Sequence, residues 1–133
     1  MITEKDKHGF RFRDWGVYKN ARLFRMEMKK IWKKFPTEEA YALTDQIRRA
    51  TTSILLNIAE GSNKTTDKDT RLYINRALCS LDEVVACMDV ALDEGYINKE
   101  EHLSSFECAA PLARQLKGFT VYLKNSSSKI KDK

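Results

Sequence analysis

Apolar side chains recur at helical spacing along most of the chain. In the first such stretch, about residues 14–34, they step alternately by four and three residues: Val17, Ala21, Phe24, Met28, Ile31 and Phe35. This spacing gathers them on one side of a helix. Three further stretches repeat the pattern, at about residues 38–60, 67–94 and 98–124, and no segment of comparable length alternates as a strand would. The pattern predicts four amphipathic helices, each burying a single face.

Capping residues and helix breakers separate these four stretches. The predicted N-caps are Asp14, Thr37, Thr66 and Asn98. Asp69 and Glu101 each follow a cap by three residues, the spacing of a capping box. Gly61 is predicted to be the left-handed residue after the second helix, and Gly95 ends the third. Pro111 is expected to kink or break the fourth helix.

The lengths of the helices and connections predict one domain. The chain has 133 residues, of which 42% are hydrophobic, and only short polar segments join the helices. We therefore expect an all-α, antiparallel up-down four-helix bundle over residues 14–124. Residues 1–13 are expected to form a basic N-terminal arm and residues 125–133 a flexible C-terminal tail.

Several chemistries are disfavoured by composition. The chain has no apolar run of the roughly 18 residues that a membrane span needs, and residues 1–13 do not resemble a secretory signal. Cys79 and Cys87, on one predicted helix, would lie about 12 Å apart along its axis, too far for a disulfide. His8 and His102 are far apart in sequence and no CxxC occurs. We expect a cytoplasmic protein with no metal, no cofactor and no membrane partner.

Positive charge is concentrated in the first predicted helix and the segment before it. The net charge is +5, but residues 1–34 alone carry 11 Lys/Arg against 4 Asp/Glu, so the remainder is slightly acidic. A cationic stripe lies opposite the apolar side of this helix: Lys19, Arg22, Arg25, Lys29, Lys30 and Lys33. Glu27 is the only acid between Val17 and Lys34. An ordinary solvated face usually mixes signs, so this stripe favours an anionic partner.

Three interpretations of the stripe stay open. It could be a solvated surface, it could bind the phosphate backbone of a nucleic acid, or it could face an acidic helix of a neighbouring protein. The third predicted helix carries Asp82, Asp89 and Asp93 on one flank, which keeps a protein partner or a second subunit possible. An anionic membrane surface fits less well, because the opposite face is needed for the core.

A polar line runs beside the apolar side of the second predicted helix. Its members step by three or four residues: Gln46, Arg49, Ser53, Asn57 and Glu60. Such a line forms buried hydrogen bonds within a chain or fixes the register of a subunit interface. Glu60 with Arg49 could suggest acid–base chemistry, but no histidine, nucleophile or Gly-rich loop accompanies them, so we expect no enzyme activity. Arg48 is expected on the outer surface, with the cationic stripe.

The segments 43–50 and 53–61 resemble a known family. They read Leu-Thr-Asp-Gln-Ile-Arg-Arg-Ala and Ser-Ile-Leu-Leu-Asn-Ile-Ala-Glu-Gly, and residues 35–39 (Phe-Pro-Thr-Glu-Glu) precede them. The pattern is similar to the four-helix-bundle family encoded in intervening sequences of bacterial 23S ribosomal RNA genes, also called the S23 ribosomal protein family. The similarity covers roughly residues 12–123. Asn75, Arg76 and Pro111 depart from the family pattern, which bears on subunit contacts and not on the bundle.

The resemblance implies a non-enzymatic bundle, commonly a ring-shaped homopentamer, that associates with RNA. The same fold occurs in accessory variability proteins of diversity-generating retroelements, which are basic pentamers that bind nucleic acid and assist a reverse transcriptase. Together with the cationic stripe, it leads us to expect an oligomeric nucleic-acid-binding protein, with RNA as the expected partner. The alternative is an accessory or scaffold subunit of a reverse transcriptase.

Overall fold

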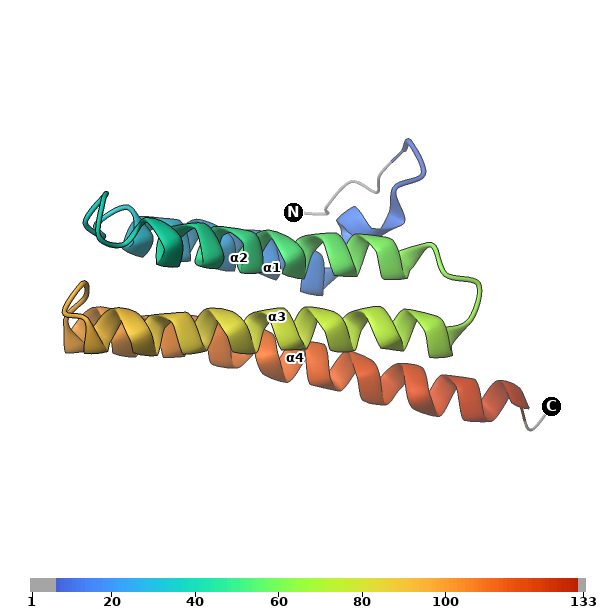
Figure 1. The fold of residues 1–133 in the computed structure, drawn as a ribbon. Coiled ribbons are helices and arrows are strands. Elements are labelled where there is room, and N and C mark those ends of the chain that lie inside the picture. The colour runs from blue at the N-terminus through green and yellow to red at the C-terminus, as the bar shows by residue number, and fades with distance from the viewer. Residues whose placement is uncertain (1–6, 132–133) are drawn as a thin grey trace, which may run out of the picture.

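The structure is an up-and-down bundle of four helices. The computed structural model describes residues 7–131, with side chains described as far as Ser126. The elements are the short 3-10 helix η1 (Arg11–Asp14), α1 (Gly16–Trp32), α2 (Tyr41–Ser62), α3 (Asp67–Asp93) and α4 (Lys99–Lys131). Neighbouring helices run antiparallel through short connections, and the described part of the chain contains no strand (Figure 1). The predicted all-α bundle is confirmed.

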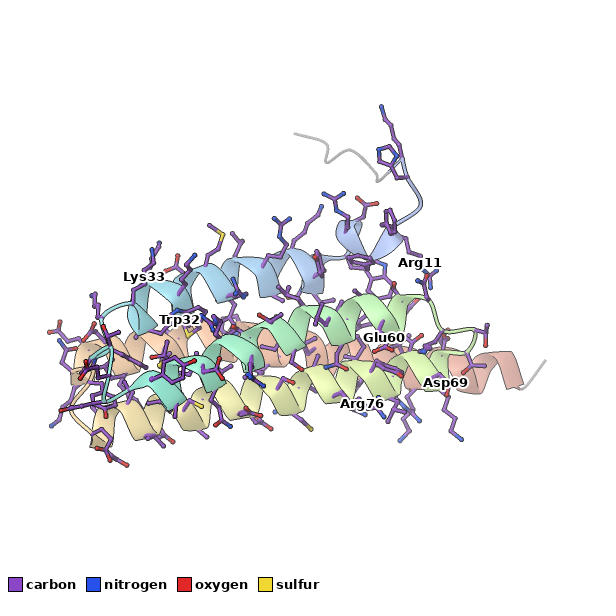
Figure 2. The ribbon with its side chains drawn as sticks, turned by 45° about the horizontal axis from the view of Figure 1, so that its top comes forward. Arg11, Trp32, Lys33, Glu60, Asp69 and Arg76 are labelled. Atoms are coloured by element: carbon purple, nitrogen blue, oxygen red, sulfur yellow. The ribbon has the colours of Figure 1, made fainter. Side chains whose placement is uncertain are left out.

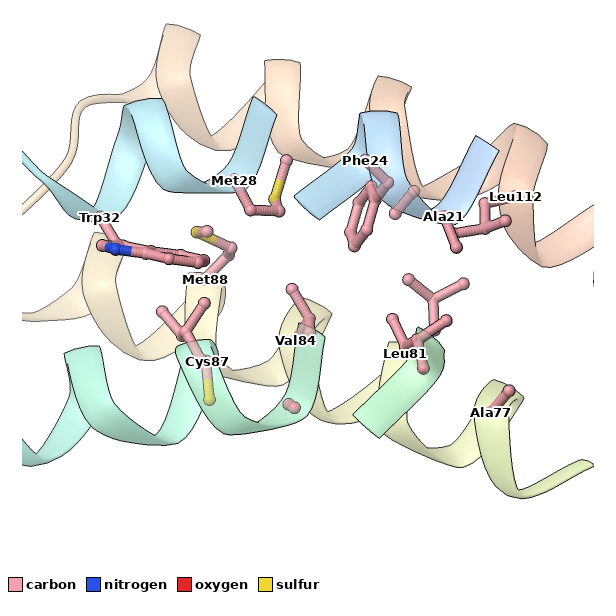
Figure 3. Close-up of a cluster of buried hydrophobic side chains, with 14 of the residues drawn as sticks. Ala21, Phe24, Met28, Trp32, Ala77, Leu81, Val84, Cys87, Met88 and Leu112 are labelled. Atoms are coloured by element: carbon pink, nitrogen blue, oxygen red, sulfur yellow. The ribbon is translucent and has the colours of Figure 1, made fainter. Parts of the chain in front are cut away.

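The core fills the space between the four helices along the length of the bundle. The largest side chains with less than 2% exposure come from every helix: Met28, Ile47, Ile54, Ile58, Ile74, Leu81, Met88 and Leu116. Figure 3 shows Phe24 and Met28 of α1 facing Val84 and Met88 of α3. Each such side chain contributes about 1.5–3 kcal/mol by leaving water. The apolar seam predicted for the first helix is buried throughout, including Phe35 beyond its end.

Two of the predicted helix starts are wrong. Asp14 belongs to η1, and Trp15 precedes α1 without a capping side-chain bond. Residues 37–40 form a turn, so α2 begins at Tyr41 after Ala40 and the N-cap role predicted for Thr37 does not arise. Both predictions chose a polar residue next to a periodic segment, whereas the chain makes a further turn before each helix.

The other two predicted starts are confirmed in atomic detail. The Thr66 hydroxyl accepts a bond from the Asp69 backbone N–H at 3.1 Å at the start of α3. At α4 the capping box is reciprocal: the Asn98 N–H donates to Glu101 Oε1 at 3.1 Å, and the Glu101 N–H donates to Asn98 Oδ1 at 2.8 Å. Gly95 has a φ of +75°, as the end of α3 requires.

Gly61 has a different role from the one predicted. It lies inside α2, it is buried, and its φ is not positive. A Cβ at this position would lie 2.9 Å from the Tyr73 Cβ and 3.4 Å from the Thr70 carbonyl oxygen. The Thr70 hydroxyl also donates to the Gly61 carbonyl at 2.9 Å. Gly61 therefore allows α2 and α3 to approach closely, and α2 continues to Ser62.

The N-terminal end of the described chain is more regular than the sequence suggested. The Arg11 Nε donates to the Ser62 carbonyl at 3.0 Å at the end of α2, and the Phe12 ring packs against Tyr18 with 4.8 Å between the ring centroids. Only residues 7–10 of the expected basic arm are described without helix, and residues 1–6 lie outside the described residues.

Of the kink or break predicted at Pro111, the break does not occur, because α4 runs through this residue to Lys131. Pro111 lies on the exposed side of α4. A proline inside a helix leaves the carbonyl four residues earlier without its hydrogen-bond donor, and a position on the exposed side keeps the ring out of the core. Residues 125–131 of the expected flexible tail belong to this helix, and residues 132–133 lie outside the described residues.

Candidate functional site

The cations of α1 divide into two sets according to the helix that each side of α1 faces. On the α4 side, Lys30 pairs with Glu27 at 3.0 Å, and Lys34, just beyond α1, pairs with Glu101 at 3.1 Å. Four further cations of the predicted stripe lie on the remaining outer surface, and none of them has a described carboxylate within 4.0 Å: Lys19, Arg22, Lys29 and Lys33. Figure 2 shows Lys33 pointing away from the bundle. Apart from Lys30, the stripe is therefore not neutralised by carboxylates in the described part of its own chain.

Arg25 connects this surface to α2. Its Nε donates to the Thr52 hydroxyl at 3.2 Å, and its guanidinium carbon lies 5.6 Å from the centroid of the Trp32 ring. The side chain is half-buried, whereas the other stripe members on this side are mostly exposed. The aromatic ring and the hydroxyl hold the guanidinium in place, and a guanidinium is always charged in proteins. Arg25 therefore contributes a fixed positive charge where the two helices meet.

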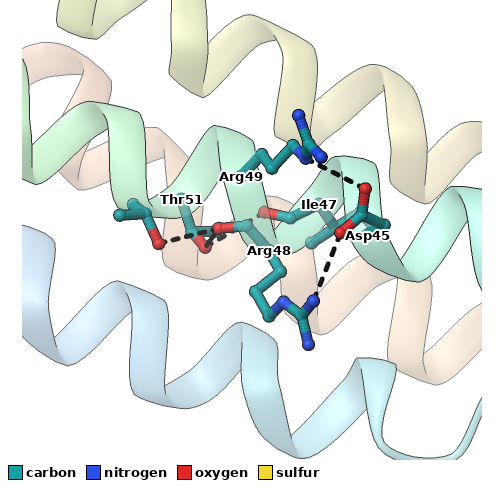
Figure 4. A network of polar contacts seen from close by, with 6 residues as sticks. Asp45, Ile47, Arg48, Arg49 and Thr51 are labelled. Carbon is teal, nitrogen blue, oxygen red and sulfur yellow. Dashed lines mark hydrogen bonds and ion pairs between the residues drawn. The ribbon is translucent and has the colours of Figure 1, made fainter.

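Arg48 extends the positive surface onto α2. Its Nη2 lies 3.2 Å from Asp45 Oδ1, and the Arg49 Nε lies 2.9 Å from Asp45 Oδ2 (Figure 4). The two guanidinium groups leave α2 in opposite directions, with Arg48 on the α1 side and Arg49 toward α3. One carboxylate thus serves two guanidinium groups, which leaves a positive charge at this point. Exposed pairs of this kind contribute only about 0–1 kcal/mol, so Arg48 can exchange Asp45 for another anion.

These arginines line a shallow groove between α1 and α2 with a volume of about 530 Å³. Its walls are formed by Arg25, Asp45, Arg48, Arg49, Thr52, Ser53 and Leu56. We define the basic face as the groove arginines on the α1 side together with the unpaired cations of α1: Lys19, Arg22, Arg25, Lys29, Lys33 and Arg48. Lys30 was predicted to belong to this set, but it pairs with Glu27 and lies with Lys34 and Glu101 on the side of α1 that faces α4.

The polar line predicted on α2 lies largely within the chain, between α2 and α3. The Gln46 Nε2 donates to Glu83 Oε2 at 3.1 Å, and the hydroxyls of Ser53 and Ser80 lie 2.9 Å apart. Asn57 donates to the Ser53 carbonyl at 2.9 Å and to the Ser53 hydroxyl at 3.0 Å, both on its own helix. The Gln46–Glu83 and Ser53–Ser80 contacts align the two helices, as a structural polar seam would.

Arg49 and Glu60, two members of that line, do not take part in the contacts between α2 and α3. Arg49 pairs with Asp45 on its own helix, and Glu60 is exposed (Figure 2). They lie eleven positions apart on α2, about 16 Å along the axis. The acid–base pair that the sequence suggested is therefore not assembled.

Other chemical groups among the described residues form no site. No three His, Cys, Asp or Glu side chains in this part of the chain come together as they would around a metal ion. No described helix is long and apolar enough to cross a membrane. Burial, and secondarily the nearby Glu83, raises the pKa of the Cys87 thiol to about 11, which makes it a poor nucleophile.

Sequence reasoning missed one residue beside the basic face. Tyr41, the first residue of α2, is 69% exposed. The periodicity of apolar positions does not single it out, because it falls outside the predicted seam of the second helix. Its spacing from Asp45 and Arg48, four and seven residues, is the signal that would have placed it on the same side of α2.

Comparisons with known proteins agree with this architecture. Residues 13–118 match the family model of the 23S rRNA-intervening sequence protein. The fold is similar to the crystal structure of a protein of unknown function from the S23 ribosomal protein family of Bacteroides thetaiotaomicron VPI-5482, with a TM-score of 0.71 and 22% identity. The similarity covers 78% of this chain and 97% of that one. No curated protein sequence matches the chain. The structural likeness concerns the fold alone.

Proposed function

The chain belongs to the 23S rRNA-intervening sequence protein family, and we propose that it is a non-enzymatic RNA-binding bundle that holds backbone phosphates on its basic face. The observation that carries the proposal is the group of cations without a described carboxylate partner: Lys19, Arg22, Lys29 and Lys33. Like charges one turn apart repel one another, and a polyanion laid along α1 removes that cost.

The dimensions of the basic face support a nucleic-acid strand as the ligand. From Arg22 to Lys33 the helix rises about 16 Å. At the spacing of about 3.4 Å per charge along one strand of duplex DNA, this length corresponds to about five backbone phosphates. Arg25 and Arg48 widen the face toward α2, so that the positive surface is broader than a single row of side chains.

Neutralisation inside the chain finds no support in the packing. α1 packs against α2 and α4, whereas Asp82, Asp89 and Asp93, the acids expected to face the stripe of a second subunit, lie on α3. On the α2 side, the nearest acid of the groove is Asp45, which already serves two arginines. Binding through phosphates also predicts a strong dependence of affinity on salt.

A charge-matched pair of variants tests the proposal. The first variant changes the unpaired cations of the basic face to glutamine: Lys19, Arg22, Lys29 and Lys33. The control removes the same charge elsewhere by changing exposed lysines to glutamine: Lys30, Lys34, Lys68 and Lys117. Fluorescence anisotropy with a structured RNA would be measured at two or more salt concentrations, and circular dichroism would confirm that both variants fold.

The first variant is expected to lower the slope of log K against log salt by up to about 3, because each phosphate contact contributes about 0.7–0.9. The control is expected to change the slope by less than about 1. Absence of binding by the unmodified protein at low salt would contradict the proposal. Equal losses in the two variants would do so too, because they would show attraction by net charge alone.

A further inference from the structure

Tyr41 differs from the other exposed aromatic side chains in having no partner among the described residues. The described aromatics with more than a third of their surface exposed are Phe10, Tyr41, Phe106 and Tyr122. The other three pack against a neighbouring ring, with centroid distances between 4.7 and 6.4 Å. Tyr41 is the most exposed of the four, at 69%, and makes no hydrogen bond or ring contact with a described residue. Tyr41 therefore presents an aromatic face that no described ring covers.

The fold places this ring at one end of the basic face. Tyr41 opens α2, and Asp45 and Arg48 follow on the same side of the helix at one and two turns. Because α1 and α2 are antiparallel and joined by a short turn, Lys33 at the end of α1 lies at the same end of the bundle as Tyr41. Tyr41 and Arg48 are separated by about 10 Å along α2. A phosphate at the groove and a base at the ring are therefore within reach of one short strand.

We propose that the basic face takes an unpaired stretch of RNA, with one base stacked on the Tyr41 ring; this inference rests on the function proposed above. A base inside a duplex has both of its faces covered by neighbouring bases, so only an unstacked base can use the ring. Cations that track the backbone and an aromatic side chain that stacks a base are the combination by which proteins hold single strands. The remaining aromatics near the groove cannot substitute: Trp32 is 6% exposed and Phe24 is 4% exposed.

The main competing occupant is another protein that covers Tyr41 with an apolar surface. The surroundings favour the strand, because Tyr41 is followed on its side of α2 by a charged pair and a positively charged groove. An apolar interface would deplete charged residues at its centre. The experiment below includes a measurement that a protein interface would change and a base-stacking site would not.

The test uses the full chain and two fluorescent probes: an unstructured adenosine oligonucleotide and an RNA duplex with the same number of phosphates. The variants are Tyr41→Ala, Tyr41→Phe and Tyr122→Ala. Tyr122 is a matched control, because it is 65% exposed but lies on α4 and is stacked near Phe119. Affinity is measured by anisotropy at fixed salt, and mass is measured by analytical ultracentrifugation without RNA.

Tyr41→Ala is expected to weaken single-strand binding by about fivefold or more, the lower end of the effect of stacking one base. Duplex binding is expected to change by less than about twofold, and Tyr41→Phe and Tyr122→Ala are expected to bind both probes as the unmodified protein does. Unchanged single-strand binding by Tyr41→Ala overturns the inference, and so does an equal loss on the duplex. A loss of affinity in Tyr41→Phe as large as in Tyr41→Ala also overturns it, because that result indicates a contact through the hydroxyl. A smaller mass for Tyr41→Ala overturns it as well, because that result indicates a protein interface. If neither probe binds the unmodified protein at low salt, the proposed function itself has failed.

Discussion

The close approach of α2 and α3 at Gly61 allows a sharp test of the packing. In Gly61→Ala the new Cβ would lie 2.9 Å from the Tyr73 Cβ. That atom is attached directly to the α3 backbone, so no side-chain rotation can move it away. The helices must separate, which also stretches the 2.9 Å bond from the Thr70 hydroxyl to the Gly61 carbonyl. Forcing an extra methyl group into such a site costs about 1–3 kcal/mol.

The matched control is Gly118→Ala, because Gly118 lies inside α4 and a Cβ added there would have no neighbouring atom within 4 Å. Both substitutions gain about 0.5–1 kcal/mol from the better helix propensity of alanine. The difference in the free energy of unfolding between the two variants therefore isolates the contact, and we expect Gly118→Ala to be the more stable by about 1–3 kcal/mol. Urea unfolding followed by circular dichroism measures this difference. Two variants of equal stability would show that α2 and α3 are not held this closely.

Two further predictions concern titratable groups. Hydrogen bonding by the Asn98 backbone N–H, and then by Lys34, lowers the pKa of the Glu101 carboxyl. The stabilisation by the ionised Glu101 carboxylate should be complete above the ordinary carboxyl pKa and should be lost as the pH falls through the lowered pKa of the folded state. The unfolding free energies of the unmodified protein and of Glu101→Gln should therefore converge in acid. Cys79 is exposed and Cys87 is buried with a pKa raised to about 11. A thiol reagent at a pH of about 8 should therefore modify Cys79 in the folded protein and Cys87 only after unfolding, as mass spectrometry of peptides would show.

The helices themselves could be predicted because each buries one continuous apolar side. The spacing from Val17 to Phe35 brings these apolar side chains to one side of a helix, and every one of them is buried. Caps were predictable where a side chain closes a local hydrogen bond, as Thr66 and Asn98 do. The role of Gly61 was not, because glycine after a helical stretch also suits a helix end, and only the position of Tyr73 on another helix distinguishes the two.

The polar line on α2 shows the same division between local and tertiary information. Periodicity alone placed Gln46, Ser53 and Asn57 beside the core, where the structure finds Gln46 and Ser53 bonded to α3 and Asn57 bonded to Ser53. Periodicity could not separate these residues from Arg49 and Glu60, because a contact between the two helices depends on which α3 side chain lies opposite each position. The number of subunits and a reverse transcriptase partner stay predictions from the family resemblance, since helical periodicity does not count chains.

The availability of each cation on α1 depends on its position around the helix. Lys29 and Lys30 are adjacent in sequence, and a step of about 100° turns them toward different sides. Lys30 faces the side on which Glu27 and the acids of α4 lie, and it is paired. Lys29 faces the side on which α2 presents Arg48, and it has no described carboxylate partner. The two adjacent lysines therefore differ, because Lys30 is paired with Glu27 of its own helix and Lys29 is left for an external anion. We expect a polyanion to approach α1 from the side that faces α2 and not from the side that faces α4.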